Sequence, residues 1–309
     1  MRVAFFGTGS PMSTHALDAI VTRCTVVAVV VPALPRGRGL RSLSRRLARR
    51  RGRGPLVRRA RAQGLPVVEF ARGRESDLVA SLGPLHPDLL CVATFPCLIP
   101  PQALALAPLG ALGLHPSLLP RRRGPDPLFW SYFEGDEVTG VSVFCLDGDA
   151  DTGPVVAQET VALPRGRPGR DAYEEIARRG AALLAQAVAD AAAGKLELRA
   201  QDEAAATRQP APDACRVELG EAAAEWLWHF LSGIGPERLH VRSDGGRPLL
   251  HGEVRGYART ALRPPGTVER WNGGWRLHCR DGYVEVAGTS WMRAARARLS
   301  GARPRALVR

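Results

Sequence analysis

A histidine and a cluster of three acids are the residues whose types and positions could do chemistry in this chain. His115 closes a short apolar run and is followed by a loop rich in proline and arginine. Asp147, Asp149 and Asp151 crowd one turn between two predicted strands. A carboxylate beside an imidazole orients the ring and favours its protonated form. The three carboxylates could also be a solvated turn, and such a histidine taken alone is more often structural than catalytic. The residues by themselves therefore leave an acid–base role open.

The segments that precede these residues are typical of an α/β fold with a largely parallel sheet. Strands are predicted at 2–6, 25–31, 66–70 and 88–94, and they alternate with helices at 11–23 and 76–82. The run at 25–31 is almost entirely β-branched, as expected of a strand that is covered on both faces. His115 would then lie at the carboxyl edge of the sheet, where open α/β folds hold their sites.

The rest of the chain is predicted to complete this domain and to form a second one. Strands at 139–146 and 155–161 lead into a helix that Asp171 and Glu174 cap and that Gly194 ends. The predicted division is a first domain at 1–197, a linker at 198–216, a second domain at 217–290 and a basic tail at 291–309.

The second domain is predicted to be a small β-barrel. A helix at 222–231 precedes short strands at 238–289, which are broken by Gly-Gly, Asn-Gly and Asp-Gly pairs. The last twenty residues show no pattern of regular structure.

Two motifs that suggest a ligand lack essential residues. Gly7-Thr8-Gly9 has Met12 at the position of the third glycine of a dinucleotide-binding turn, so a plain strand-to-helix turn is the better interpretation. The turn at 147–151 resembles the start of a calcium loop, but Thr152 and Gln158 stand where glycine and glutamate are needed. Serine-hydrolase, P-loop and zinc motifs are missing, so the sequence predicts no metal site.

The net charge of +13 comes from one segment of the chain. Residues 36–63 hold twelve arginines and no acid, and removing those twelve from the 43 basic residues leaves 31 against 30 acidic residues. Residues 293–309 add six arginines, again without an acid. Such patches attract polyanions in a salt-dependent way. Lys195 is the single lysine, so a general preference for arginine explains the patches equally well.

Length and composition indicate a globular protein of about two domains. The chain has 309 residues, of which 45% are hydrophobic and 24% charged. No apolar run approaches the roughly 20 residues of a membrane span, and the first residues are typical of a buried strand, not of a signal peptide. Six cysteines without a C-x-x-C pair predict a reducing cytoplasm. We expect no membrane partner.

Two segments around the candidate residues resemble the folate-dependent formyltransferases. They are GLHPSLLPRRRG at 113–124 and CLDGDADTGPVV at 145–156, similar to the family pattern N-x-H-x-SLLP-x-x-RG and its D-x-x-x-D-TG loop. MRVAFFGTGS resembles the opening strand of the family, and VATFPCLIP at 92–100 resembles the strand and loop that line the folate pocket. Residues 265–288 are similar to part of the C-terminal barrel of the methionyl-tRNA formyltransferases.

The resemblance implies a Rossmann-like formyltransferase domain followed by an OB-like β-barrel. The co-substrate would be 10-formyltetrahydrofolate, whose amine acceptor attacks the formyl carbon to give a tetrahedral intermediate. His115 would stabilise developing charge and help to move protons, and Asp151, which has the Thr-Gly neighbour of the motif, would orient it. The residues implied to bind the folate are Phe95, Ser117, Leu118, Leu119, Pro120, Cys145, Leu146 and Asp147.

Gly113 departs from the family pattern, which has a catalytic asparagine two residues before the histidine. That amide donates a hydrogen bond to the formyl oxygen, and losing such a donor typically costs about 10²–10³ in rate. Another donor or a water could replace it, the site could transfer a different acyl group, or the chain could be a paralogue that binds folate or RNA without catalysis. The intact His115, Asp151 and SLLP loop favour an enzyme.

Two acceptors are compatible with the resemblance. The length and the barrel favour methionyl-tRNA, and the arginines expected to contact tRNA phosphates are Arg45, Arg46, Arg49, Arg50, Arg121, Arg122 and Arg123. The alternative is a small amine, such as an amino sugar or a hydroxyornithine-like precursor. The aromatic residues of PDPLFWSYFEGD at 125–136 could line a pocket for it, or could pack as a helix on the core. We expect a monomer.

Overall fold

The structure is a computed structural model that describes residues 1–33, 54–212, 215–235, 239–241, 253–287 and 306–308. The chain divides into two compact units. Unit 1 comprises Met1–Gly124, Thr139–Val161 and Tyr173–Arg208, and unit 2 comprises Pro125–Val138, Ala162–Ala172 and Gln209–Arg309. Two segments inside the predicted first domain, 125–138 and 162–172, thus belong to unit 2.

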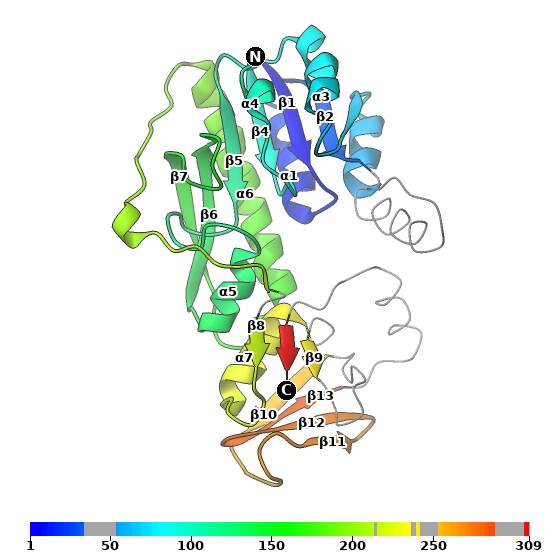
Figure 1. Cartoon of the computed structure of the whole chain (residues 1–309), viewed down its shortest axis with the longest axis vertical. Coiled ribbons are helices and arrows are strands. Elements are labelled where there is room, and N and C mark those ends of the chain that lie inside the picture. Colours follow the sequence, from blue (N-terminus) through cyan, green and yellow to red (C-terminus); the bar gives the residue numbers. More distant parts are fainter. Residues whose placement is uncertain (34–53, 213–214, 236–238, 242–252, 288–305, 309) are drawn as a thin grey trace. The chain divides into compact units, whose positions relative to one another are not determined.

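Unit 1 is built on a seven-stranded sheet with the order β3-β2-β1-β4-β5-β6-β7 (Figure 1). The strands are β1 (Arg2–Gly7), β2 (Thr25–Pro32), β3 (Val67–Phe70), β4 (Leu89–Ala93), β5 (Ala111–His115), β6 (Val138–Cys145) and β7 (Val155–Ala162). β1 to β5 are parallel, whereas β6 pairs antiparallel with β5. The predicted α/β class with a largely parallel sheet is confirmed.

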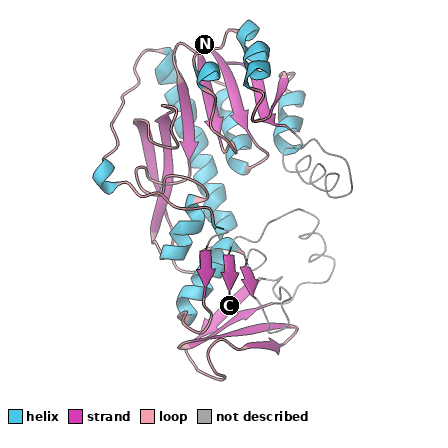
Figure 2. Ribbon diagram, in the orientation of Figure 1, coloured by secondary structure: helices cyan, strands magenta, loops and turns pink. Residues whose placement is uncertain are grey.

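Helices cover both faces of this sheet (Figure 2). They include α1 (Pro11–Ile20), α3 (Glu75–Leu82), α4 (Pro101–Leu104) and α6 (Gly169–Ala192). Ala4 and Phe6 of β1 join residues of α3 and α4 in one buried cluster, while Val3 and Phe5 are buried on the opposite face. Because both faces are buried, the central strands consist almost entirely of apolar residues.

Two helix ends differ from the sequence-based expectation. The Ser10 hydroxyl accepts a hydrogen bond from the Ser13 N–H at 3.2 Å and caps α1, which ends at Ile20 and not near residue 23. α6 begins at Gly169, so Asp171 lies within its first turn and is not the cap. A carboxylate in the first turn still interacts favourably with the helix dipole.

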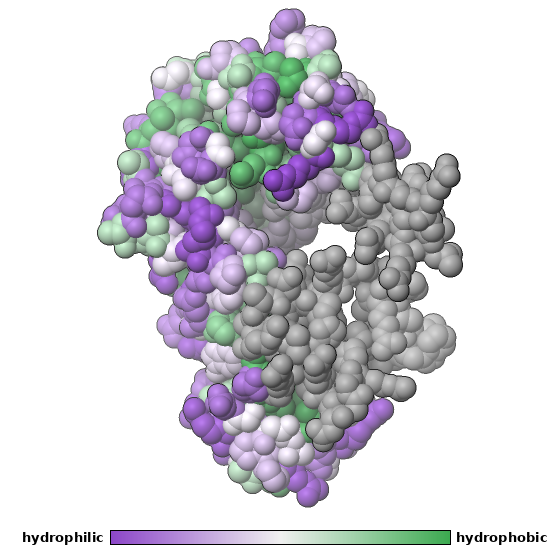
Figure 3. All heavy atoms as spheres, in the orientation of Figure 1, coloured by the Kyte–Doolittle hydropathy of each residue, from purple (hydrophilic) through white to green (hydrophobic). Residues whose placement is uncertain are grey.

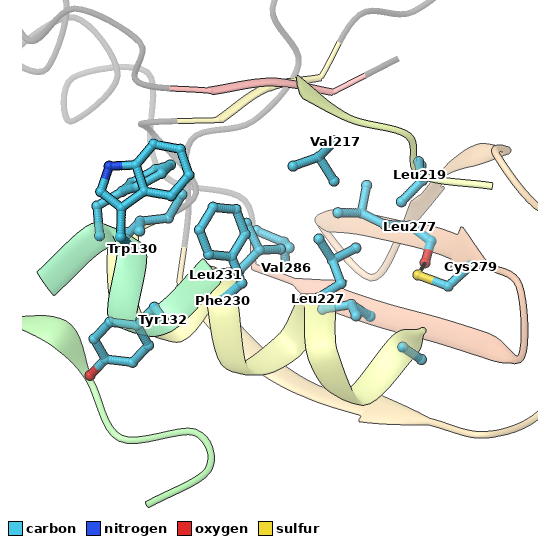
Figure 4. Close-up of a cluster of buried hydrophobic side chains, with 14 of the residues drawn as sticks. Trp130, Tyr132, Val217, Leu219, Leu227, Phe230, Leu231, Leu277, Cys279 and Val286 are labelled. Carbon is cyan, nitrogen blue, oxygen red and sulfur yellow. Dashed lines mark hydrogen bonds between the residues drawn. The ribbon is translucent and has the colours of Figure 1, made fainter. Parts of the chain in front are cut away.

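Unit 2 packs α7 against a four-stranded antiparallel sheet, and α5 against α7. The sheet has the order β10-β13-β12-β11. The elements are α5 (Pro127–Glu134), α7 (Ala224–Ile234), β10 (Val254–Ala258), β11 (Val268–Trp271), β12 (Gly274–Cys279) and β13 (Gly282–Val286). Figure 4 shows Phe230 and Leu231 of α7 in one buried cluster with Trp130 of α5 and with Leu277 and Val286 of the sheet. Burying one such side chain contributes roughly 1.5–3 kcal/mol.

A second sheet of unit 2 contains the last described residues. Its strands are β8 (Cys215–Val217), β9 (Leu239–Val241) and β14 (Ala306–Val308), with β14 in the centre and parallel to both neighbours. The expectation that the last twenty residues lack regular structure is therefore wrong for 306–308. No local pattern marks this strand, because both of its partners are distant in the sequence.

The segment 199–208, which we call the strap, runs from α6 across two loops of unit 1 (yellow-green in Figure 1). Arg199 exchanges two backbone hydrogen bonds with Val155, at 2.8 and 2.9 Å. The Thr207 N–H donates to the carbonyl of Pro120 at 3.2 Å, and the Arg123 N–H donates to the carbonyl of Thr207 at 2.8 Å. These residues fall in the predicted linker, yet they are tied to the loops that follow β5 and β6.

The described surface contains both hydrophobic and hydrophilic residues. Figure 3 shows one face, on which small groups of hydrophobic residues alternate with hydrophilic ones. Among the helices that the structure describes, none combines the length and the apolar character needed to cross a membrane.

His229 of α7 is a fully buried histidine whose surroundings favour its neutral form. Its ring lies 4.9 Å from that of Tyr132, and its Nδ1 accepts a hydrogen bond from the Gly166 N–H at 3.0 Å. Its Nε2 is buried and has no hydrogen-bond partner within the described part of the chain. Burial, together with the charge of Arg165, lowers the pKa of His229. Protonation therefore favours the unfolded state.

We expect unit 2 to lose stability as the pH falls below about 6.5, the ordinary histidine pKa. The folded state takes up the proton at a lower pH than the unfolded state. The stabilisation is therefore fully present above the unfolded-state pKa and is lost as the pH falls below it, by at most about 1.4 kcal/mol per pH unit. His229→Asn, which keeps an acceptor for Gly166, should weaken this dependence. Urea unfolding followed by tryptophan fluorescence reports unit 2, because the five tryptophans in the described part of the chain belong to it.

The matched control is His86→Asn. His86 is exposed and has a φ of 41°, which asparagine tolerates. This variant should keep the pH dependence of the unaltered protein. Identical slopes of unfolding free energy against pH for the two variants would contradict the assignment to His229.

Candidate functional site

The structure brings His115 and Asp151 together, as the sequence predicts. His115 is the last residue of β5, and Asp151 lies in the loop between β6 and β7. Nδ1 of His115 lies 3.6 Å from Oδ1 of Asp151, and the two side chains are 7% and 20% exposed. The separation is longer than a hydrogen bond, but catalytic contacts are often long before substrate binds. The pair lies at the carboxyl end of the parallel strands.

Main-chain groups of the loop 122–124 form hydrogen bonds with His115 and with Asp151. Nε2 of His115 lies 2.8 Å from the carbonyl oxygen of Arg122. Because a carbonyl only accepts, Nε2 carries the hydrogen and Nδ1 faces the carboxylate. The Gly124 N–H donates to Oδ2 of Asp151 at 2.8 Å. The loop 122–124 thus fixes both the ring and the carboxylate.

The other two acids of the turn lie outside this arrangement. Asp147 and Asp149 are exposed. Oδ1 of Asp147 accepts hydrogen bonds from the Thr152 hydroxyl at 2.8 Å and from the Asp149 N–H at 3.3 Å, which closes the turn. Within the described ranges, no group of three or more histidine, cysteine or acidic residues could hold a metal ion.

The SLLP loop is fixed by two polar residues that the sequence reasoning missed. The Ser142 hydroxyl of β6 donates to the carbonyl of Ser117 at 2.6 Å and accepts from the Leu119 N–H at 3.0 Å. The amide of Gln158 in β7 donates to the carbonyl of Leu119 at 2.7 Å. Ser142, a fully buried serine in a mostly apolar strand, was the available signal, because buried polar groups need partners.

Three other residues expected to bind the folate, Phe95, Cys145 and Leu146, are partly buried. Phe95 and Leu146 are partly buried and pack against the same cluster under the ends of the strands. The Phe95 ring stacks on Phe70 at 6.2 Å and meets Phe6 edge-on at 5.5 Å. Burial raises the pKa of the Cys145 thiol, so this residue remains a protonated thiol at neutral pH.

Gly113 is enclosed by side chains. A Cβ at this position would lie 2.6 Å from Cε1 of Phe144 and 2.8 Å from Cδ1 of Leu146. Phe144 is 4% exposed, and its ring meets the His115 ring edge-on at 6.5 Å. The space beside residue 113 is therefore occupied by an aromatic ring.

The arginines expected to contact phosphate differ in exposure. Arg121 is exposed, whereas Arg122 and Arg123 are only 3% and 5% exposed. Arg123 forms an ion pair with Glu203 at 2.6 Å, and this contact raises the pKa of the guanidinium and lowers that of the carboxyl. Burial and pairing do not support the expectation that Arg122 and Arg123 contact phosphate. The predicted residues Arg45, Arg46, Arg49 and Arg50 lie outside the described residues.

The aromatic segment at 125–136 belongs to the core of unit 2. Phe129, Trp130 and Tyr132 of α5 are at most 7% exposed and form part of one buried cluster. The indole N–H of Trp130 donates to the carbonyl of Pro210 at 3.1 Å, and the Tyr132 hydroxyl donates to the carbonyl of Arg167 at 2.7 Å. These rings have a structural role, which removes the observation that favoured a small-amine pocket.

A largely parallel α/β sheet with a histidine–carboxylate pair at the ends of its strands is an arrangement typical of α/β proteins that use acid–base chemistry. Within that class the chain belongs to the formyl transferase family, whose sequence profile, described as "Formyl transferase", matches residues 1–188. The resemblance inferred from the sequence is confirmed.

Two curated relatives are named methionyl-tRNA formyltransferase. The protein of Chloroflexus aggregans is 39% identical over 209 residues, which are 67% of this chain and 64% of that protein. The chain thus matches less than two thirds of this relative's length. The protein of Acidobacterium capsulatum is 30% identical over 293 residues, which are 93% of this chain and 91% of that protein.

A solved structure shares the fold. The N-formyltransferase from Helicobacter canadensis, in complex with folinic acid and dTDP-3-aminofucose, covers 94% of this chain and 99% of its own with a TM-score of 0.65. Its sequence identity is 13%, so the similarity concerns the fold alone.

We expect Gly113→Ala to destabilise unit 1. Its methyl group would overlap the ring of Phe144, which is packed and cannot move freely, and overpacking of this kind costs about 1–3 kcal/mol. The measurement is the free energy of unfolding in urea, followed by far-ultraviolet circular dichroism. Gly256→Ala is the matched control, because Gly256 is also a strand glycine but a Cβ added there would have no heavy atom within 4 Å. If both variants are equally stable, the space beside residue 113 is open.

Proposed function

We propose that this protein transfers a formyl group from 10-formyltetrahydrofolate to the amino group of methionyl-tRNA, a one-carbon step of protein biosynthesis. The observation that carries the proposal is the pairing of His115 with Asp151 on the two segments that match the family motifs. Relatives named methionyl-tRNA formyltransferase support the acceptor, and one of them aligns with 93% of this chain.

The residues beside the pair are chemically suited to a folate. Phe95, Cys97 and Leu146 are apolar, partly exposed and packed on one cluster, so they offer a wall for a planar heteroaromatic ring. The SLLP loop, which Ser142 and Gln158 hold rigid, lies next along the chain from His115. When bound, the co-substrate supplies an activated formyl group. The protein has to position it and manage the proton of the acceptor amine.

His115 is suited to receive that proton. Its Nε2–H is held by the Arg122 carbonyl, so the free electron pair is on Nδ1. Once Nδ1 is protonated, the carboxylate of Asp151, 3.6 Å away, stabilises the positive charge. Asp151 itself stays oriented by the Gly124 N–H. The pair can thus act as a general base and later return the proton.

The formyl oxygen needs a donor that residue 113 does not supply. Glycine has no side chain, and the adjacent space is filled by Phe144 and Leu146. We propose that a backbone N–H or a water donates in its place, since an enzyme without any such donor would be slower by about 10²–10³. The role of Gly113 would then be to leave space for the Phe144 ring beside His115.

Contacts with tRNA are proposed for Arg121 and for the arginine-rich segment 36–63. Arg121 is exposed at the end of the SLLP loop. The segment holds twelve of the 43 basic residues and no acid, which suits non-specific contact with phosphates. These contacts would hold the acceptor arm without reading its sequence.

Three finer features are also proposed. The four antiparallel strands β10 to β13 would form part of an OB-like barrel, as the family resemblance implies. The protein would be a monomer, and it would act in the cytoplasm. Five cysteines in the described part of the chain are unpaired, which suits a reducing compartment.

We expect release of tetrahydrofolate from the formylated co-substrate when initiator Met-tRNA is present. His115→Ala should lower turnover by about 10²–10⁴, the usual contribution of a general base, and Asp151→Asn should lower it as well. His86→Asn, at an exposed histidine whose left-handed backbone asparagine tolerates, is the control. Turnover only with a panel of small amines would redirect the proposal to that acceptor, and no turnover with any amine would leave a binding paralogue.

We expect tRNA binding to weaken steeply as salt is raised, because phosphate contacts release counterions. Replacing Arg45, Arg46, Arg49 and Arg50 by alanine should weaken binding further and flatten the slope of log K against log salt. A control variant removes the same charge at four scattered, exposed arginines: Arg23, Arg170, Arg178 and Arg255. Binding near background that is insensitive to salt, or equal losses in both variants, would argue against this segment as the tRNA contact.

A further inference from the structure

The amide of Gln201 in the strap contacts the main chain of the catalytic turn. Its Nε2 donates to the carbonyl of Asp151 at 2.9 Å and to the carbonyl of Gly153 at 2.7 Å. Asp151 has a φ of 61°, a left-handed conformation that residues with a side chain rarely adopt. Such a conformation persists where its surroundings hold it. Gln201 supplies two of those contacts.

The other end of the same amide contacts the loop on the opposite side of the pair. Oε1 of Gln201 accepts hydrogen bonds from Nε and Nη2 of Arg123, at 3.1 and 2.9 Å. Glu203 accepts from Nη1 and Nη2 of the same guanidinium, at 2.9 and 2.6 Å. Arg123 is 5% exposed, so its charge is buried and needs these partners.

Arg123 lies between the two residues that hold the pair. On one side, the Arg122 carbonyl contacts His115; on the other, the Gly124 N–H contacts Asp151. A single side chain therefore joins both loops: Gln201 holds the carbonyl of Asp151 with its nitrogen and the 122–124 loop, through Arg123, with its oxygen.

We propose that Gln201 is a positioning residue that sets the distance between His115 and Asp151, with Arg123 as its partner. The role in catalysis rests on the proposed function, whereas the geometric role does not. Gln201 touches neither side chain of the pair and acts through the backbone of both loops. The strap is thereby part of the site and more than a connection between the two units.

The test combines an isosteric variant with a readout that needs no substrate. Gln201→Glu keeps the size of the side chain and strengthens the contact with Arg123, but it cannot donate to the two carbonyls. Gln201→Ala removes both contacts. The matched control is Gln186→Glu at an exposed position of α6. This variant also loses a hydrogen bond that the glutamine amide donates, in this case to Asp190. The ring ¹⁵N chemical shifts of His115, assigned with His115→Asn, report the surroundings of each nitrogen.

We expect both Gln201 variants to change the Nδ1 shift in the direction that Asp151→Asn changes it, while Gln186→Glu leaves it unaltered. We also expect kcat for formyl transfer to fall about 10- to 100-fold, with little change in KM, because small misplacements of catalytic groups have costs of that order. Thermal unfolding verifies that Gln201→Glu is folded.

The outcomes separate the two proposals. Unchanged ring shifts and unchanged kcat in Gln201→Glu overturn the positioning role and leave formyl transfer intact. Changed ring shifts in a protein that transfers no formyl group support the positioning role and overturn the proposed function. A lower kcat with unchanged ring shifts overturns the positioning role, because the loss would then arise elsewhere.

Discussion

The loop 122–124 is the constraint on which the site depends, because it holds both partners through main-chain atoms. The Arg122 carbonyl fixes the tautomer of His115, and the Gly124 N–H fixes one oxygen of Asp151. Main-chain groups cannot change rotamer, so the geometry of the pair follows from the path of the backbone. Arg122 and Asp151, with φ values of 62° and 61°, are both left-handed, so that path needs external support. The strap provides it through hydrogen bonds to both loops.

The members of the pair could be predicted from the sequence, but their supports could not. His115 and Asp151 lie in motifs of fixed spacing, and the carboxyl edge of a parallel sheet is where sites gather. Ser142, Gln158 and Gln201 are polar residues in segments with no motif, and they matter only because of which carbonyls they meet. Such partners depend on tertiary contacts between residues that are far apart in the chain.

In the fold, too, elements with a local sequence pattern could be predicted, whereas elements that depend on long-range contacts could not. The apolar run of β2 and the alternation of strands and helices predicted the parallel sheet, because burial on both faces leaves a local signature. The strand 306–308 left none, since its pairing with β8 and β9 is long-range. The aromatic run of α5 was ambiguous for a related reason. Phe129 and Trp130 would be equally apolar in a pocket or in a core, and only the packing against Phe230 and its neighbours shows that they are core residues.

Gly113 is best understood together with Phe144. The missing side chain at 113 leaves room that the Phe144 ring fills, and that ring, buried with Leu119 and Val155, forms one wall of the space around His115. An apolar wall excludes water and lowers the local dielectric constant, which strengthens the attraction between a protonated imidazole and the carboxylate of Asp151. A glycine at 113 therefore lets an apolar ring lie beside the pair, in space that the side chain of a larger residue would need.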